Sequence, residues 1–176
     1  MDYRRVELFN GKVFKVPKYI VRLDSSKTHG WQLRFGDSKL YSDHSIDGSG
    51  ARASLRLATA ELARRLRKMP APSGLRTTAS ARKVNDLPLG ISGPMVRNRP
   101  GRGSAHYYLQ VSYPVMGARS VNRSIYVATE NTLCKDKFDA ALAKAIALRD
   151  SGVRKFKLAN TKSMRARAGK SGLLAK

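Results

Sequence analysis

The sequence predicts an α+β fold with two small three-stranded antiparallel sheets, each backed by one α-helix, and an N-terminal β-hairpin. Short runs of alternating apolar and polar residues precede an amphipathic helical segment, and this pattern occurs twice. A stretch of linker-like composition separates the two occurrences. The 176 residues are enough for two small domains. We therefore expect one domain over residues 1–69 and a second over residues 89–152.

The first element is a β-hairpin within residues 3–17. Asn10-Gly11 stands between two alternating runs. This dipeptide favours a tight hairpin turn, because both turn positions of that type need a positive φ. We expect the hairpin to pack on the first sheet or to extend it.

The first sheet is predicted from runs at residues 19–24, 31–35 and 39–43, and its helix from residues 51–69. Trp31, Leu33 and Phe35 alternate with Gln32 and Arg34, so a period of two puts the apolar set on one face. Leu40 fits the same inner face, which leaves its two neighbours outside. The helix carries an apolar stripe for the sheet at Leu55, Ala58, Leu62 and Leu66.

Residues 70–88 are rich in Pro, Ser, Thr and Gly, which predicts a flexible linker. The second sheet is predicted from runs at residues 90–96, 106–113 and 120–127, and its helix from residues 134–150. That helix has an apolar stripe at Phe138, Ala141, Leu142, Ala145 and Ile146. Residues 153–176 hold eight Lys and Arg and no acidic residue, so we expect a disordered basic tail.

The charge of the chain favours a polyanionic partner. There are 35 Lys and Arg against 12 Asp and Glu, a net charge of +23, and the pI is near 10.9. Such a surface repels itself unless a polyanion neutralises it, and nucleic acid is the commonest such partner. Acidic membrane surfaces and acidic proteins are the alternatives on charge alone. No apolar run reaches the length of a membrane span, so we expect no membrane partner.

The sequence does not suggest an enzyme, a cofactor or a metal site. The single cysteine, Cys134, allows no disulfide framework. His29, His44 and His106 are not at metal-ligand spacing with it or with one another. There is no glycine-rich phosphate loop and no nucleophile motif. We expect a cytoplasmic, nucleoid-associated protein, or one in the host cytoplasm if it is phage-encoded.

The second unit resembles a known DNA-binding family. The resemblance rests on residues 90–92, a basic loop, residues 107–111 and 123–127, and a helix ending at residues 145–150. These segments look like prokaryotic and phage members of the apetala-two/ethylene-response-factor (ERF-like) DNA-binding domain, and the first unit resembles it more weakly. The family implies a three-stranded antiparallel sheet backed by one helix, with the sheet in the DNA major groove.

The resemblance implies that the outward residues of each sheet contact double-stranded DNA. In such a groove Arg pairs with guanine edges and Gln with adenine, whereas Lys and Tyr more often meet phosphate. The residues expected at this interface are Arg22, Gln32, Arg34, Lys39 and Tyr41 in the first unit, and Tyr108, Gln110, Arg123, Ser124 and Tyr126 in the second, with Arg97, Arg99 and Arg102 from the basic loop.

The expected function is therefore that of a non-enzymatic double-stranded DNA-binding protein with two ERF-like domains in tandem. Within this class it is a bacterial or phage transcriptional regulator or a nucleoid-associated protein. Two other classes stay open. One is an RNA-binding or ribosome-associated protein, because a sheet with exposed tyrosines could stack unpaired bases. The other is a phage adaptor or inhibitor that binds a host protein.

Overall fold

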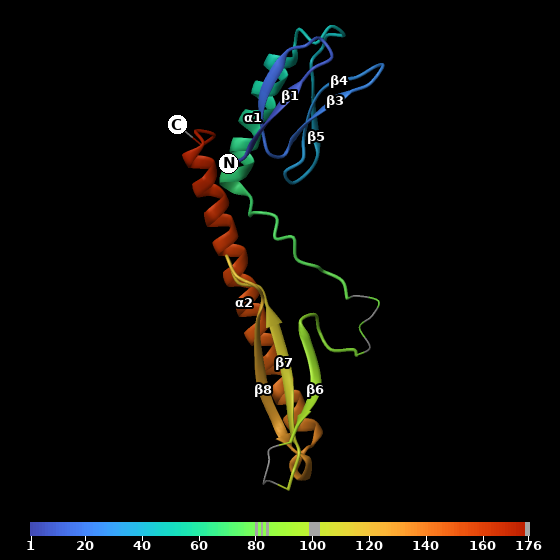
Figure 1. The fold of residues 1–176 in the computed structure, drawn as a ribbon, viewed down its shortest axis with the longest axis vertical. Coiled ribbons are helices and arrows are strands. Elements are labelled where there is room, and N and C mark those ends of the chain that lie inside the picture. Colours follow the sequence, from blue (N-terminus) through green and yellow to red (C-terminus); the bar gives the residue numbers. More distant parts are fainter. Residues whose placement is uncertain (80, 82, 84, 99–102, 175–176) are drawn as a thin grey trace. The chain divides into compact units, whose positions relative to one another are not determined.

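The computed structural model describes residues 1–79, 81, 83, 85–98 and 103–174 and confirms the α+β fold (Figure 1). Two three-stranded antiparallel sheets are accompanied by an N-terminal two-stranded hairpin and two long helices. The elements in chain order are β1 (Tyr3–Glu7), β2 (Val13–Pro17), β3 (Ile20–Asp24), β4 (His29–Leu33), β5 (Lys39–Ser42), α1 (Ala51–Lys68), β6 (Ile91–Arg97), β7 (His106–Tyr113), β8 (Val121–Thr129), η1 (Glu130–Thr132) and α2 (Lys135–Lys170).

The chain forms two compact units, and the first is discontinuous in sequence. Unit 1 consists of residues 1–71 together with residues 161–176, and unit 2 consists of residues 72–160. The sequence predicted instead that the first domain ends at residue 69 and that the last residues stand apart. Among the described residues of the predicted linker, 70–88, there is no helix or strand.

The predicted hairpin is present, but its turn is longer than the Asn-Gly pair suggests. Strands β1 and β2 are antiparallel, with Glu7 opposite Val13. The loop between them closes with a hydrogen bond from the Leu8 amide to the Lys12 carbonyl, at 2.9 Å. Gly11 has a positive φ of 75°, whereas Asn10 does not have one. The Asn10 side chain instead donates to the Asp47 carbonyl at 2.8 Å and holds the loop before α1.

The core of unit 1 lies between one face of the β3-β4-β5 sheet, helix α1 and the hairpin. Trp31, Leu33 and Phe35 are fully or almost fully buried, as their alternation predicts. The Trp31 indole donates to the Ala51 carbonyl at the start of α1, at 2.8 Å. The Phe14 ring of β2 meets the indole edge-on, with the ring centroids 5.9 Å apart. Ala58, Leu62 and Leu66 of the predicted α1 stripe are buried, and Leu55 is partly buried.

Strand β5 has the opposite face assignment from the predicted one. Its register places Lys39 opposite Leu33, Leu40 opposite Gln32 and Tyr41 opposite Trp31. Because directly opposed residues share a face of a sheet, Lys39 and Tyr41 lie on the inner face. Leu40 lies on the outer face and is 42% exposed. The prediction that Leu40 points inward was wrong.

The C-terminal segment is helical where the sequence predicted a disordered tail. Helix α2 continues to Lys170, and Ala168 is fully buried in the core of unit 1. Gly172 has a φ of 77°, and the Leu173 amide donates to the Ala168 carbonyl at 3.1 Å. Together these form a Schellman-type helix end, in which glycine takes the left-handed position. Met164, Leu173 and Leu174 pack against the same core.

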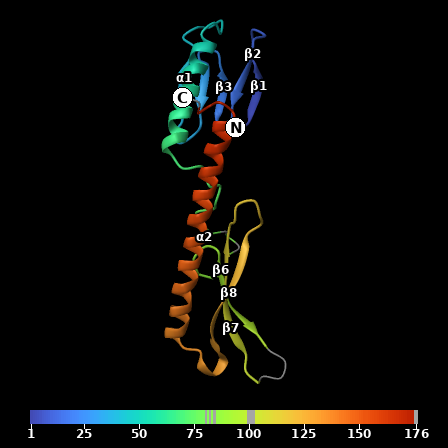
Figure 2. The same ribbon diagram turned by 90° about the vertical axis from the view of Figure 1, so that its left-hand side faces the viewer.

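The N-terminus lies beside this segment (Figure 2). The amino group of Met1 donates to the Arg167 carbonyl, and Asp2 pairs with the Arg167 guanidinium at 2.7 Å. The Arg165 side chain donates to the Leu66 carbonyl at the end of α1, at 2.9 Å. The apolar contacts and these bonds explain why a basic segment of low apolar content is ordered. Each of them depends on a partner distant in sequence, so the local sequence did not predict the order.

Unit 2 has the predicted sheet and helix. Leu109 and Val111 of β7 are fully buried, and they pack with Ile91 and Val127 against Ala141 and Ala145 of α2. Phe138 and Leu142 of the predicted stripe are partly buried, whereas Ile146 is 37% exposed. The register of the sheet shifts twice, between Ser92 and Met95 and between Tyr107 and Tyr108.

Candidate nucleic-acid interface

The outer face of the unit 2 sheet gathers five of the predicted contact residues. Tyr108 is opposite Tyr126, and Gln110 is opposite Ser124. Tyr108 and Gln110 alternate with the buried Leu109 and Val111, so they and their partners lie on the face away from α2. Arg97 of β6 reaches the same face, because its guanidinium donates to the Ser124 hydroxyl at 3.0 Å. Tyr108, Gln110, Ser124 and Tyr126 thus have the outward position that the sequence predicts, whereas Arg97, which was expected in the basic loop, is the last residue of β6.

The side chains of this face contact one another. The Arg97 guanidinium carbon lies 5.0 Å from the centroid of the Tyr108 ring, within cation–π range. The Tyr108 and Tyr126 rings meet nearly edge-on, with centroids 5.6 Å apart. Tyr126 is 49% exposed. Arg97, Tyr108, Gln110, Ser124 and Tyr126, together with His106, are called the outer cluster below.

The sequence prediction did not include His106. This residue is opposite Arg97 in β7, and its ring centroid is 6.0 Å from that of Tyr126. It belongs to the same alternation as Tyr108 and Gln110, two and four residues further along the strand. That alternation was the available signal for a third aromatic ring on this face.

Among the described residues predicted in unit 2, Arg123 does not join the outer cluster. Arg123 is opposite Val111 and so lies on the inner side of the sheet, although it is exposed at the edge strand β8. Two adjacent strand residues point to opposite faces, so Arg123 and Ser124 could not both be outward. Arg99 and Arg102 lie outside the described residues.

In unit 1 only two of the predicted residues lie on the outer sheet face. Gln32 is opposite Leu40, and the Arg34 side chain donates to the Gln32 amide oxygen at 2.7 Å. Lys39 and Tyr41 are on the inner side. The Tyr41 hydroxyl has a raised pKa because of burial and the nearby Glu61 carboxylate. The prediction that Lys39 and Tyr41 are outward was wrong.

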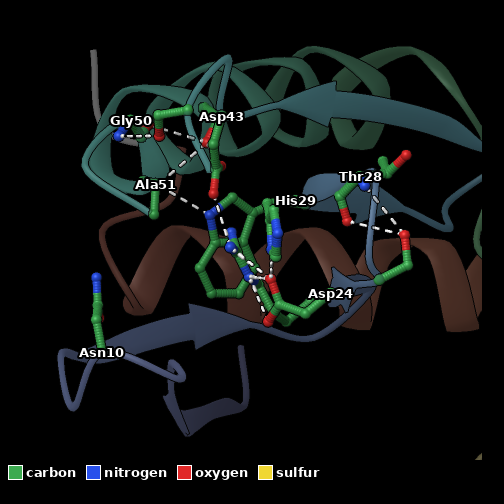
Figure 3. Close-up of polar contacts among 12 residues, drawn as sticks. Asn10, Asp24, Thr28, His29, Asp43, Gly50 and Ala51 are labelled. Atoms are coloured by element: carbon green, nitrogen blue, oxygen red, sulfur yellow. Dashed lines mark hydrogen bonds and ion pairs between the residues drawn. The ribbon is translucent and has the colours of Figure 1, made fainter. Parts of the chain in front are cut away.

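Arg22 was also predicted to be outward, but its side chain is buried in an ion-pair cluster. Figure 3 shows Asp24, His29 and Asp43 of this cluster. The Arg22 guanidinium forms ion pairs with Asp43 and with Asp24, each at 2.7 Å, and its carbon lies 5.0 Å from the Trp31 ring centroid. The side chains of Arg22 and Asp43 are 7% and 0% exposed. The His29 ring contacts Asp24 at 2.8 Å.

Charges within this cluster stabilise one another. Burial lowers the pKa of Arg22, but hydrogen bonds to Asp24 and Asp43 outweigh it and the pKa is raised. Burial raises the pKa of Asp24, but hydrogen bonds from Arg22 and His29 outweigh it, and the net change is downward. Arg22 and Asp24 therefore hold each other in their charged forms, and Arg22 is not available to a ligand.

The chemistry of the outer cluster is that of a binding surface. It presents a guanidinium, an amide, a hydroxyl and aromatic rings, a set that serves hydrogen bonding and stacking. Among the described residues, no group of three or more His, Cys, Asp or Glu is placed to hold a metal ion. None of the helices in the described part of the chain has both the length and the apolar character needed to cross a bilayer.

Comparison of the chain with protein-family models, with curated proteins and with solved structures gives no match.

Proposed function

We propose that the protein binds double-stranded DNA, with the outer cluster of unit 2 placed against the major groove in the manner of an ERF-like sheet. The observation that supports this most is the position of Arg97. Its guanidinium is held between the Tyr108 ring and the Ser124 hydroxyl on an exposed sheet face. A side chain fixed in this way loses less rotamer freedom when it binds.

The neighbouring side chains fit the same role. Arg makes bidentate bonds to guanine and Gln makes them to adenine, each worth about 1–3 kcal/mol of discrimination. Arg97 and Gln110 are therefore the residues that would carry sequence preference, and the tyrosines would meet phosphate or sugar. The net charge of +23 supplies the salt-dependent part of the affinity.

A titration of labelled duplex DNA at several salt concentrations tests the proposal. Affinity should fall steeply with salt, with a log–log slope of about −0.9 for each phosphate neutralised. Arg97→Gln should weaken binding to a selected site by about tenfold or more. Arg119→Gln is the matched control, because it removes the same charge from an exposed loop of unit 2. Equal losses in the two variants would contradict a specific role for the outer cluster.

Within this function, the proposed role is that of a bacterial or phage regulator or of a nucleoid-associated coat. Competition with random-sequence duplex separates the two. A specificity ratio near one favours the coat, whereas a regulator should prefer its site by about a thousandfold or more.

The aromatic rings of the outer cluster favour RNA as a second candidate partner. Tyr126 lies within ring-contact distance of both Tyr108 and His106, and aromatic rings on a sheet stack unpaired RNA bases. Treating a cell extract with ribonuclease or with deoxyribonuclease shows which enzyme releases the protein. Release by ribonuclease alone would replace the DNA proposal.

A further inference from the structure

The outward face of helix α1 in unit 1 carries a row of cations. Arg52, Arg56, Arg64, Arg67 and Lys68 are all exposed, while Ala51, Ala58, Leu62 and Leu66 are buried on the opposite side. These five residues are called the α1 basic stripe. From Arg52 to Lys68 the stripe extends for about 24 Å, at about 1.5 Å per residue.

Most of this charge is not neutralised within the protein. The α1 sequence has one acidic residue, Glu61, which pairs with Arg64 at 2.6 Å and with Arg65 at 2.8 Å. Arg67 donates to the Leu174 carbonyl at 3.4 Å. In the part of the chain that the structure describes, the side chains of Arg52, Arg56 and Lys68 have no hydrogen-bond or ion-pair partner.

The placement of Arg52 is unfavourable for the isolated helix. The first turn of α1 contains no acidic residue, although the positive end of the helix dipole favours acids there and disfavours cations. A cation at this position is explained more simply by an anionic ligand than by helix stability.

The outer sheet face of unit 1 is mostly apolar, unlike the outward face of α1. On the outer sheet face of unit 1, Val21, Leu23 and Leu40 are apolar, and Arg34 is the cation beside them. In unit 1 the exposed cations therefore stand mainly on the helix and not on the outer sheet face.

We infer that the α1 basic stripe binds the phosphate backbone of double-stranded DNA, so that unit 1 contacts DNA through its helix and not through its sheet. This inference rests on the proposed function. Guanidinium groups bond phosphates in a bidentate way and suit such a contact. A basic helix can also lie on an anionic membrane by burying its apolar face in the lipid. The apolar face of α1 is already buried in the protein core, which favours DNA.

Two triple variants of the full chain test the inference. Arg52→Gln with Arg56→Gln and Lys68→Gln removes three cations of the stripe without removing a partner from Glu61. Arg5→Gln with Lys12→Gln and Lys27→Gln removes the same charge from exposed positions of unit 1 away from α1. Glutamine keeps the helix propensity, and Trp31 fluorescence reports whether unit 1 is folded.

In the stripe variant, the slope of log affinity against log salt should be less steep by about 0.9 for each phosphate that the protein no longer neutralises. Its affinity should fall by about tenfold or more relative to the control variant. Equal decreases in affinity in both variants overturn the inference and leave duplex binding intact. No duplex binding by the unchanged protein overturns the proposed function itself. If the stripe variant loses binding to phosphatidylserine vesicles but keeps the DNA affinity of the unchanged protein, the inference is also overturned.

A second measurement does not depend on changing the charge. In a Cys134→Ser background, an iron chelate attached at Ala60→Cys would stand on the outward face of α1, between Arg56 and Arg64. The same chelate at Leu40→Cys would stand on the outer sheet face. Stronger duplex cleavage from position 60 is expected, and stronger cleavage from position 40 contradicts the inference.

Discussion

At the scale of single residues, the guanidinium of Arg22 contacts both the apolar core of unit 1 and a buried carboxylate. It lies over the Trp31 indole in the core and bonds to the fully buried carboxylate of Asp43. Ser54 of α1 donates to the other oxygen of that carboxylate. The ion pair thus connects β3, the loop after β5 and the first turns of α1.

Arg22→Leu should destabilise unit 1 strongly. Removing one member of a buried ion pair leaves an uncompensated charge and costs about 3–5 kcal/mol. Urea unfolding followed by Trp31, the only tryptophan, measures this loss directly. Arg34→Leu, at an exposed position, should change the free energy of unfolding by no more than about 0.5 kcal/mol. Weaker DNA binding by Arg22→Leu at unchanged stability would show instead that Arg22 contacts DNA.

Glu61 should make the stability of unit 1 depend on pH in the acid range. Hydrogen bonds from Arg64 and Arg65 lower the pKa of Glu61 from 4.5 to about 2. A carboxylate with a lowered pKa stabilises the fold above its unfolded pKa, and this contribution is lost as the pH falls toward the folded value. Between about pH 6 and about pH 3, the unchanged protein should therefore lose more stability than Glu61→Gln. The same loss in both proteins would contradict the pairing.

The residues of the candidate site were predictable where their neighbours in sequence decide their position. Tyr108 and Gln110 alternate with two buried residues of a long strand, so their outward position follows from the period alone. The position of Arg22 depends on Asp43, which is 21 residues away, and no local pattern reveals that pairing. A basic residue in a predicted strand is therefore only weak evidence that its side chain is exposed.

At the scale of elements, strands and helices with several apolar positions were predictable in place and in facing, whereas the short strand β5 was predicted at the right place with the wrong facing. Its four residues contain one aliphatic side chain, Leu40. One apolar residue cannot fix the phase of a two-residue period, and the pairing of Tyr41 with Trp31 decides it. The C-terminal part of α2 is a similar case, because Met164 and Ala168 acquire their core only from unit 1.

Ala168 provides a test of this packing. Ala168→Leu inserts a larger side chain at a fully buried position, and overpacking costs about 1–3 kcal/mol. Ala166→Leu, on the exposed side of the same helix, should change stability by no more than about 0.5 kcal/mol. Trp31 fluorescence during urea unfolding distinguishes them. Two indistinguishable variants would mean that the tail is not part of the core of unit 1.

At the scale of the whole molecule, unit 1 is assembled from both ends of the described chain. Residues 161–174 contribute the buried Ala168 and several partly buried side chains to it. The Ala71 amide donates to the Thr161 hydroxyl at 3.0 Å. The two units are therefore connected twice, once through residues 70–88 and once through helix α2. A single flexible linker, as the sequence predicted, would have connected them only once.

Cleavage of the first connection should not separate the fragments. A protease site inserted between Arg76 and Thr77, both exposed, allows the chain to be cut there after folding. Because the second fragment carries part of the core of unit 1, the two fragments should elute together in size-exclusion chromatography. Addition of urea should then release them. Separate elution under native conditions would show that residues 161–174 hold too little of the core to retain the first fragment.

Because unit 1 is made of two separate segments of the chain, the two units complete their folds in a set order during synthesis on the ribosome. Domains commonly fold in the order in which they are translated. Here unit 2 is a continuous segment and has all of its residues before those of unit 1 are complete. The nascent β1–α1 portion must therefore wait, with the site for Ala168 and Leu173 uncovered, until the last residues emerge. The half of the molecule that is translated first is the last to be finished.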